Sequence, residues 1–299
     1  MSRPALAATR GVEILNFLAA HPHERFTLSE LARRVDVNVA STHAVLGVLG
    51  DAGYVVRDAR SRRYGLGPAL VAVGTAALEQ HPAIDVARDE IRRLAEELDL
   101  ELLVTARAGD EVVCVAHAGR HQPHGAPLRV GQRVPLVPPL GSVFLAWSSA
   151  AEVDAWLARA GASLSDIERA AARAALGVVR ANGYSIGLEA PARRELGAAV
   201  VRLADEPRAR HVRDSIDASI AELAHDDYQL LDVEGGRGYD VSMIASPVFG
   251  ATGETELALT LYGFPPGLMG SRVVEYAERL RGTALVVTKR ADGRLPATA

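Results

Sequence analysis

Three features of the sequence predict an α+β fold divided into two domains. Residues 27–57 contain two short amphipathic helical patterns separated by a tight polar break. An arginine-rich turn between two short extended segments follows them directly. From residue 82 onward, helical patterns alternate with pairs of strand patterns, an order typical of an α+β domain in which helices flank a sheet.

The first short helix is predicted over 28–35, where Leu28, Leu31 and Val35 recur on one helical face. Its start is marked by Thr27, which stands three residues before Glu30 at the spacing of a capping box. A preceding helix over 9–20 is expected to pack behind it, as the third helix of a small domain. The apolar side chains of that preceding helix are Val12, Leu15, Leu18 and Ala19.

The second short helix is predicted over 39–52, and Gly53 ends it as a C′ glycine. Two helices joined by so short a turn are typical of a DNA-binding helix-turn-helix, whose second helix lies in the major groove. The side chains expected to be buried are Val45, Leu46, Val48 and Leu49. The DNA-contacting side chains predicted on the two helices are Thr27, Ser41, Thr42 and His43.

A basic hairpin is predicted next, with strands over 54–56 and 64–66 joined by the polar turn 58–63. A helix-turn-helix followed by such a hairpin is a winged helix, whose arginines would meet phosphates or a minor groove. A small helical module with a solvated hairpin and no ligand is the alternative, but the order of the elements favours DNA binding. The arginines concerned are Arg57, Arg60, Arg62 and Arg63.

An alanine-rich stretch over 66–80 predicts a linker helix, and Pro82 separates it from a further helix over 84–98. The domains predicted are therefore a winged helix-turn-helix over 1–66, a linker helix over 67–81, an α+β domain over 82–290 and a disordered tail over 291–299.

The α+β domain is predicted to contain two strand pairs and several helices. Strands are expected over 102–106, 112–116, 241–249 and 256–262, with a short extended segment at 184–188. Helices are expected over 141–148, 152–160, 165–181 and 270–289.

Composition is that of an ordinary globular protein, with 48% hydrophobic and 23% charged residues in 299. The single cysteine, the lack of a signal-peptide pattern and the lack of a long apolar run predict a cytoplasmic protein that does not enter a membrane. Residues 1–80 carry nine arginines and seven acidic side chains, whereas 81–299 carry 24 basic and 30 acidic ones. Because the positive charge of residues 1–80 is so mild, tight DNA binding is expected to need two N-terminal DNA-binding domains per molecule, and hence a dimer.

Catalytic motifs are lacking: the sequence has no Gly-x-Ser-x-Gly elbow, Walker glycine loop or His-Glu-x-x-His pattern, so we predict no enzyme and no cofactor. His117, His121 and His124, with Cys114 nearby, could bind zinc if their loop folded back. Their spacing matches no strong zinc pattern, and solvated loop histidines are the favoured interpretation, so no metal site is predicted.

The sequence resembles the IclR family of bacterial transcription regulators. The resemblance is carried in order by ILNFLAA, FTLSELARRVDV, STHAVLGVLGDAGYVVRD, RRYGLGPALVAVG, GQRVPLVPPLGSVFLAW, ANGYSIGLEA and ASPVFGATGETELALTLYG. It implies a winged helix joined by a linker helix to a GAF-like effector-binding domain. It also implies a homodimer or a dimer of dimers, an operator of double-stranded DNA, and a small organic or aromatic acid as effector.

The effector site implied lies between the 135–142 loop and the hairpin 241–262. Thr260 and Tyr262 are two residues apart on one strand and so face the same way, and Ser142 at a helix start could bind a carboxylate. The apolar lining expected is Val137, Pro139, Leu140, Gly141 and Met243, and the hydrogen-bonding groups expected are Ser142, Ser246, Thr260 and Tyr262.

The sequence departs from the family pattern in three places. Val39, Ala40 and Ala44 stand where polar or basic side chains are common at the recognition helix, so base readout is expected to be sparse. Val137 and Ser142 replace a histidine and a lysine, which predicts a bulkier, less charged ligand. Residues 190–240 resemble an insertion with a helical pattern over 212–224.

The function expected is a ligand-responsive transcription regulator. The alternative is a metal-binding or enzymatic α+β domain that carries a helical N-terminal module.

Overall fold

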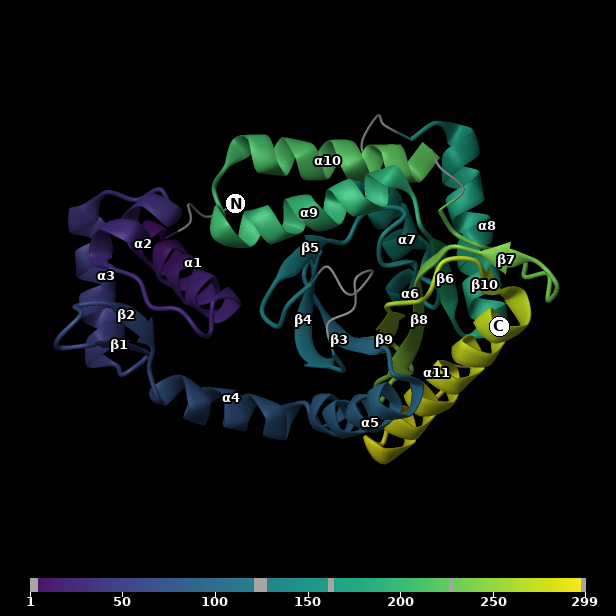
Figure 1. Cartoon of the computed structure of the whole chain (residues 1–299), viewed down its shortest axis with the longest axis horizontal. Helices are drawn as coiled ribbons and strands as arrows, with labels where there is room; N and C mark the ends of the chain where they lie inside the picture. The colour runs from purple at the N-terminus through teal and green to yellow at the C-terminus, as the bar shows by residue number, and fades with distance from the viewer. Residues whose placement is uncertain (1–4, 121–127, 161–163, 226–227, 297–299) are drawn as a thin grey trace.

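The structure is a computed structural model that describes residues 5–120, 128–160, 164–225 and 228–296. A small head at one end of the molecule is joined by an extended helix, α4 (Ala69–Gln80), to a larger body (Figure 1). The chain therefore divides into a head, a linker and a body, in the order that the sequence predicts.

The head is a three-helix bundle with a two-stranded wing. Its elements are α1 (Leu6–Ala20), α2 (Leu28–Arg34), α3 (Val39–Asp51), β1 (Val55–Arg57) and β2 (Tyr64–Leu66). The strands of the wing pair antiparallel. Ile14, Phe17, Leu31 and Leu46 form the buried centre, at 2% exposure or less.

Local hydrogen bonds fix the ends of the helices as predicted. Thr27 caps α2 in a complete capping box with Glu30, whose carboxylate accepts from the Thr27 backbone N–H at 2.7 Å. Gly53 follows α3 with φ +70°, a conformation that costs glycine little. Asn38, which the sequence analysis did not single out, caps α3 by accepting from the Ser41 backbone N–H at 2.8 Å.

Two predicted buried faces are wrong in part. Val12 is 56% exposed because α1 turns Ile14 and Phe17 inward instead, and these are the larger pair at helical spacing. Val48 is 70% exposed, since α3 packs along a row that begins at Thr42 and continues at Leu46.

The linker and body begin with two helices, α4 and α5 (Pro82–Leu98), which are separated by His81, and Pro82 starts the second. No residue of α4 is buried, whereas α5 packs Ala87, Ile91 and Leu94 against the body.

The body is built on an antiparallel sheet of six strands in the described residues, in the order β5-β4-β3-β9-β8-β6. The strands are β3 (Glu101–Ala108), β4 (Glu111–Ala118), β5 (Arg133–Pro135), β6 (Ser185–Leu188), β8 (Val241–Phe249) and β9 (Thr255–Tyr262). The predicted strand pairs are confirmed. A separate small pair, β7 (Gly238–Tyr239) and β10 (Leu268–Met269), was not predicted.

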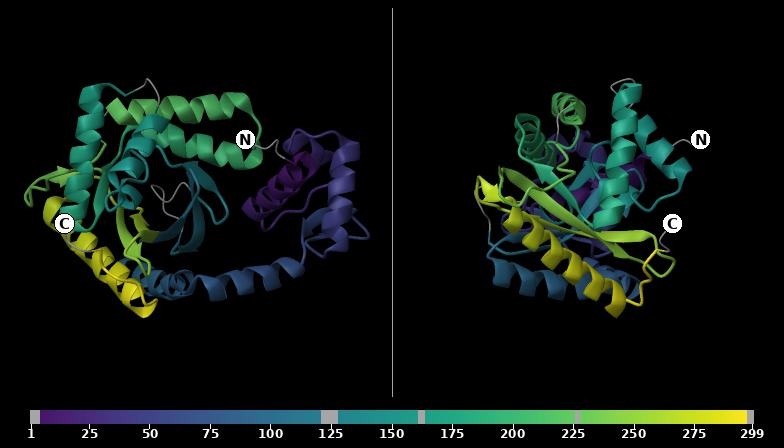
Figure 2. Two further views of the ribbon diagram at one scale, coloured as in Figure 1. Left: turned by 180° about the vertical axis from the view of Figure 1, so that it is seen from behind. Right: turned by 90° about the vertical axis from the view of Figure 1, so that its right-hand side faces the viewer.

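Helices cover both faces of the sheet (Figure 2). On one face, α5 and α11 (Gly270–Arg290) enclose the larger core. On the other lie α6 (Ser142–Leu145), α7 (Ala150–Arg159), α8 (Asp166–Asn182), α9 (Pro191–Asp205) and α10 (Arg210–His225).

Three boundaries differ from the sequence prediction. The helix expected over 141–148 is only the short α6, and the insertion holds two helices because α9 precedes the predicted helical pattern. The predicted disordered tail is in part structured: the Arg294 backbone N–H donates to the Gly250 carbonyl at 2.9 Å. In the described ranges, no helix combines the length and the apolar character needed to cross a membrane.

Candidate functional site

The first candidate site is the solvent-facing side of α3. His43 is exposed there with Ala44, Gly47 and Val48 beside it, and Ser41 is half-buried. Thr42 is fully buried, and its hydroxyl donates to the Asn38 carbonyl at 3.1 Å. The prediction that Thr42 contacts DNA is therefore wrong, because its position in the helix turns it into the head. Thr27 is half-buried as the cap of α2.

The wing is a tight turn organised by Asp58. One carboxylate oxygen of Asp58 accepts from the backbone N–H of Arg60 at 3.1 Å and of Ser61 at 2.7 Å. These hydrogen bonds hold the pKa of Asp58 below its usual value, so the turn stays anchored by a carboxylate. Arg60 and Arg62 project from it with exposed side chains.

The other two predicted arginines have partners within the head. Arg57 is exposed and lies over the Tyr64 ring, 5.6 Å from its centroid. Arg63 is half-buried and donates to the Arg25 carbonyl at 2.8 Å and to Glu30 at 3.1 Å. The Arg63 side chain thus ties the wing to the start of α2.

The second candidate site is a cavity of about 100 Å³ between the inner face of the sheet, α6 and the segment after α10. Its lining is mostly apolar, and it includes no charged side chain among the described residues. Seven predicted effector residues line it: Pro139, Leu140, Gly141, Ser142, Met243, Thr260 and Tyr262.

The polar groups of the cavity are neutral hydrogen-bonding groups. Gln229 Nε2 donates to Ser142 Oγ at 2.7 Å, which joins two walls. Burial raises the pKa of both Tyr228 and Tyr262, so their hydroxyls stay protonated. The guanidinium of Arg193 lies over the Tyr262 ring, 5.6 Å from its centroid, although Arg193 itself is not part of the lining.

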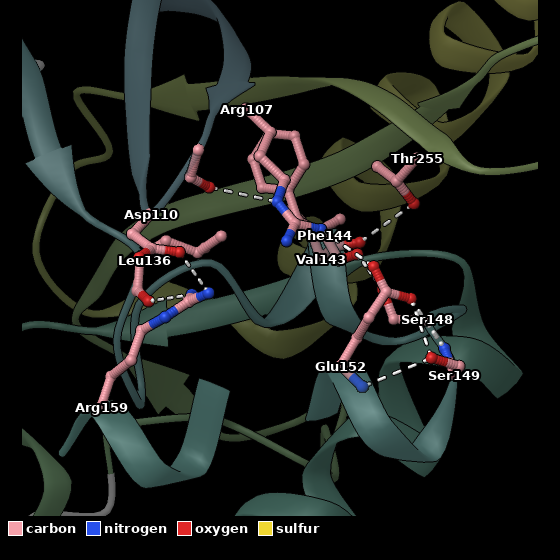
Figure 3. A network of polar contacts seen from close by, with 11 residues as sticks. Arg107, Asp110, Leu136, Val143, Phe144, Ser148, Ser149, Glu152, Arg159 and Thr255 are labelled. Atoms are coloured by element: carbon pink, nitrogen blue, oxygen red, sulfur yellow. Dashed lines mark hydrogen bonds and ion pairs between the residues drawn. The ribbon is translucent and has the colours of Figure 1, made fainter. Parts of the chain in front are cut away.

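The cavity wall formed by α6 and the preceding loop is fixed by contacts with neighbouring residues. Gly141 adopts φ +79° as the cap of α6, and a Cβ there would lie 2.1 Å from Leu136 Cδ1, so a larger residue would be strained and would displace the buried Leu136 side chain. Trp156 Nε1 donates to the Leu140 carbonyl at 3.1 Å. Arg159 donates to the Leu136 carbonyl at 3.0 Å and pairs with Asp110 (Figure 3).

Two predicted effector residues do not line the cavity. Ser246 lies on the other face of β8, where its hydroxyl donates to the Gly183 carbonyl at 2.9 Å. Since side chains alternate along a strand, Met243 and Ser246 cannot share a face of a regular strand. Val137 is half-buried beside the cavity lining. The volume of about 100 Å³ is small for the bulkier ligand expected from Val137 and Ser142 in place of a histidine and a lysine.

Sequence reasoning missed Thr105, Tyr228 and Gln229 in the lining. Alternation along β3 could have indicated Thr105, because it faces the same way as Leu103. Tyr228 and Gln229 reach the cavity through the path of the chain after α10, which no local pattern indicates.

The predicted histidine cluster is only partly described. His117 on β4 lies with Nε2 3.4 Å from Glu101 Oε1, while His121 and His124 fall outside the described residues. In the ranges that the structure covers, no group of three or more His, Cys, Asp or Glu side chains is placed to hold a metal ion.

Comparison with known proteins agrees with this architecture. Residues 7–59 match the IclR helix-turn-helix domain, and residues 75–201 match the bacterial transcriptional regulator IclR C-terminal domain. The HTH-type transcriptional regulator BhcR of Paracoccus denitrificans is 28% identical over 39% of this chain, and the match spans 41% of that relative.

Two solved structures share the fold. An IclR transcriptional regulator from Alicyclobacillus acidocaldarius has a TM-score of 0.65 at 20% identity, over 97% of this chain and 100% of its own. An IclR homolog from Microbacterium hydrocarbonoxydans complexed with 4-hydroxybenzoate has a TM-score of 0.62 at 16% identity, over 95% of this chain and 98% of its own.

A winged helix-turn-helix head on an α+β body that matches the IclR C-terminal domain defines a DNA-binding transcription regulator. Since both domain models match in order and the fold agrees over nearly the whole chain, this protein belongs to the IclR family.

Proposed function

We propose that this regulator binds its operator as a dimer and that a small organic acid in the body cavity adjusts that binding. The observation that carries the proposal is the cavity itself: apolar walls from six elements of the fold surround a few neutral hydrogen-bonding side chains. Such a lining suits a ligand with an apolar body and one or two oxygen acceptors.

The size of the cavity limits the ligand. At about 100 Å³ it is smaller than the sites of roughly 300–1,000 Å³ that hold drug-sized molecules. A short-chain or single-ring acid is therefore the class we propose, and the 4-hydroxybenzoate complex of a relative with the same fold supports that class. A single-ring acid would require the walls to move apart.

For DNA, we propose that His43 and Ser41 approach base edges and that Arg57, Arg60 and Arg62 contact phosphates. Exposure on α3 and on the wing supports these roles. Because α3 offers few hydrogen-bonding side chains at its exposed face, DNA shape, sensed through contacts to the DNA phosphate backbone, would supply much of the specificity.

The linker helix supports a dimer. Val71 is 70% exposed and Val73 is 49% exposed on α4, whose sequence is apolar over most of its length. A helix with so many exposed apolar side chains is expected to pack on a second copy of the chain.

The cavity is tested by removing two hydroxyls with little change of shape, in Thr260→Val and Tyr262→Phe. Binding of pyruvate, benzoate and 4-hydroxybenzoate is measured by calorimetry, and a hydroxyl used in the site should cost about 1–3 kcal/mol. Ser246→Ala is the matched control, because that hydroxyl faces away from the cavity. If neither variant alters the binding of any acid that the parent binds, the cavity is not the effector site.

A further inference from the structure

The head also touches the body at the tip of the α9–α10 hairpin. His21 Nε2 lies 2.9 Å from Asp205 Oδ1, and Arg34 Nη1 donates to the Asp205 carbonyl at 3.0 Å. Arg208 Nη2 lies 2.8 Å and 2.6 Å from the two carboxylate oxygens of Glu13. We call these five residues the head latch.

The head latch is anchored in the core of the head. His21 is 8% exposed, and its other ring nitrogen, Nδ1, lies 2.8 Å from the Phe17 carbonyl. Its ring also packs against Phe17 and Phe26, at centroid distances of 4.5 Å and 5.5 Å. Asp205 bonds to a side chain that is packed in the core of the head. The hairpin tip therefore constrains the whole head and not only one mobile surface side chain.

The hairpin is a stiff connection to the body. Its two helices pack together through Leu196, Val200, Val212 and Ile216, all buried. The hairpin extends from above the sheet to the head, so that the head meets the body through the hairpin as well as through α4 (Figure 1).

The contact between the head and the α9–α10 hairpin is small and polar, so the two can separate without exposing a shared apolar core. A groove of about 610 Å³ lies between α1, β5 and the hairpin, with Val12 and Phe17 of the head on one side and Leu203 and Ile216 of the hairpin on another. The two domains therefore share no continuous apolar core there, and releasing the head breaks mainly ion pairs and hydrogen bonds.

The position of Arg34 gives the direction of the effect. Arg34 ends α2, immediately before the turn that leads into the recognition helix α3. In the latched head, the Arg34 guanidinium donates to the Asp205 carbonyl, and the Asp205 carboxylate adds a negative charge beside His21 at the end of α1. Both effects oppose a DNA phosphate near this end of α2. The exposed face of α3 is not part of the latch, so DNA is disfavoured without being blocked.

We propose that the α9–α10 hairpin is an autoinhibitory latch that holds the head in a position of low DNA affinity. The end of this hairpin that is remote from the head reaches the cavity, because Tyr228 and Gln229 follow α10 and line the cavity wall. The latch therefore stands between the cavity and the head. Any control of the latch by an acid in the cavity rests on the proposed function.

The test is Arg208→Glu in the full chain, with a duplex that the parent chain selects from a random DNA pool. The variant makes the protein more negative, so charge alone predicts weaker DNA binding. Release of the latch predicts the opposite, an affinity about fivefold or more above the parent. Combining Glu13→Arg with Arg208→Glu restores an ion pair and should return the affinity towards that of the parent.

Arg210→Glu is the matched control, since it makes the same charge change two residues away at an exposed position. Its affinity should stay equal to or below that of the parent. The proposal is overturned if Arg208→Glu binds no more tightly than the parent, or if Arg210→Glu gains as much.

A measurement without DNA separates the latch from the DNA-binding function. Spin labels at Val48→Cys and Val201→Cys report the distance between the head and α9, in samples diluted with unlabelled chain. Both positions are exposed, at 70% and 41%. A single narrow distance in the parent should broaden in Arg208→Glu but not in Arg210→Glu. Equal distributions in all three proteins would refute the latch, even if no duplex were selected.

Discussion

Gln229 donates a hydrogen bond of 2.7 Å to the hydroxyl of Ser142, and this bond joins the segment after α10 to the first residue of α6. Ser142 is buried and Gln229 is half-buried, so water competes little for the contact. Both residues line the cavity, and the bond therefore holds two of its walls together.

We predict that Ser142→Ala and Gln229→Ala are coupled in their effect on stability. Each removes the same bond, so the double variant should be less destabilised than the sum of the single variants by about 0.5–1.5 kcal/mol. Urea unfolding of the four proteins measures this difference. Ser148→Ala is the control, because its hydroxyl bonds to the Phe144 carbonyl and should be additive with Gln229→Ala. Additivity of Ser142→Ala with Gln229→Ala would contradict the bond.

The arginines of the wing should separate into two kinds. Arg60→Ala and Arg62→Ala should each make the negative slope of log affinity against log salt shallower by about 0.9, because each would give up one phosphate contact. Arg63→Ala should instead lower the stability of the head, since it loses the Glu30 and Arg25 partners. Salt titrations of DNA binding and thermal unfolding distinguish the two. A slope unchanged in both Arg60 and Arg62 variants would rule out the wing contacts.

Local chemistry explains what the sequence predicts well. The Thr27–Glu30 capping box and the glycine at 53 mark helix ends through groups only a few residues apart. The strand pairs follow from alternation and turn residues, which are also local signals.

Tertiary packing decides the rest. Whether Val12 or Ile14 faces inward depends on which partner helix lies beside α1, and both choices satisfy helical spacing. The place of Gln229 in the cavity depends on the path of the chain after α10, across a large separation in sequence from Ser142. Ser246 is a different case, because strand parity relative to Met243 would have excluded it.

The recognition helix offers a paired test at neighbouring positions. His43→Ala should cost about 1–3 kcal/mol on the selected operator and little on random DNA, because it removes an exposed hydrogen-bonding side chain. Thr42→Val, at a fully buried position, should lower the stability of the head while leaving the preference for the operator unchanged. Competition binding with operator and random duplexes measures both effects. Equal losses on both duplexes for His43→Ala would assign it to positioning only.

Cys114 should be inert in the folded chain. Burial raises its pKa from 9.0 to about 12, so its thiol stays protonated at pH 8 in the folded state. The unfolded chain ionises near pH 9, and the resulting contribution to stability is complete below that pH and is lost as the pH rises towards 12. Mass spectrometry after iodoacetamide treatment at pH 8 should find alkylation in urea only. Rapid alkylation of the native chain would show that the β4 region opens readily.

We expect the linker helix α4 to form the contact between the two chains of a dimer. Val71 and Val73 point to opposite sides of α4, so Val71→Asp with Val73→Asp puts a carboxylate on whichever side packs against a second copy, where its burial would require costly desolvation. The dimer should dissociate at concentrations at least about tenfold higher than the parent dimer, a loss of roughly 1.4 kcal/mol. Analytical ultracentrifugation measures this, and the melting of each chain should change little because neither valine is buried in it. Ile167→Asp, at an 82% exposed position on α8, is the control for an added charge elsewhere. If the α4 variant sediments as the parent does, the subunits meet through another surface, and the pairing of the two heads must be set there.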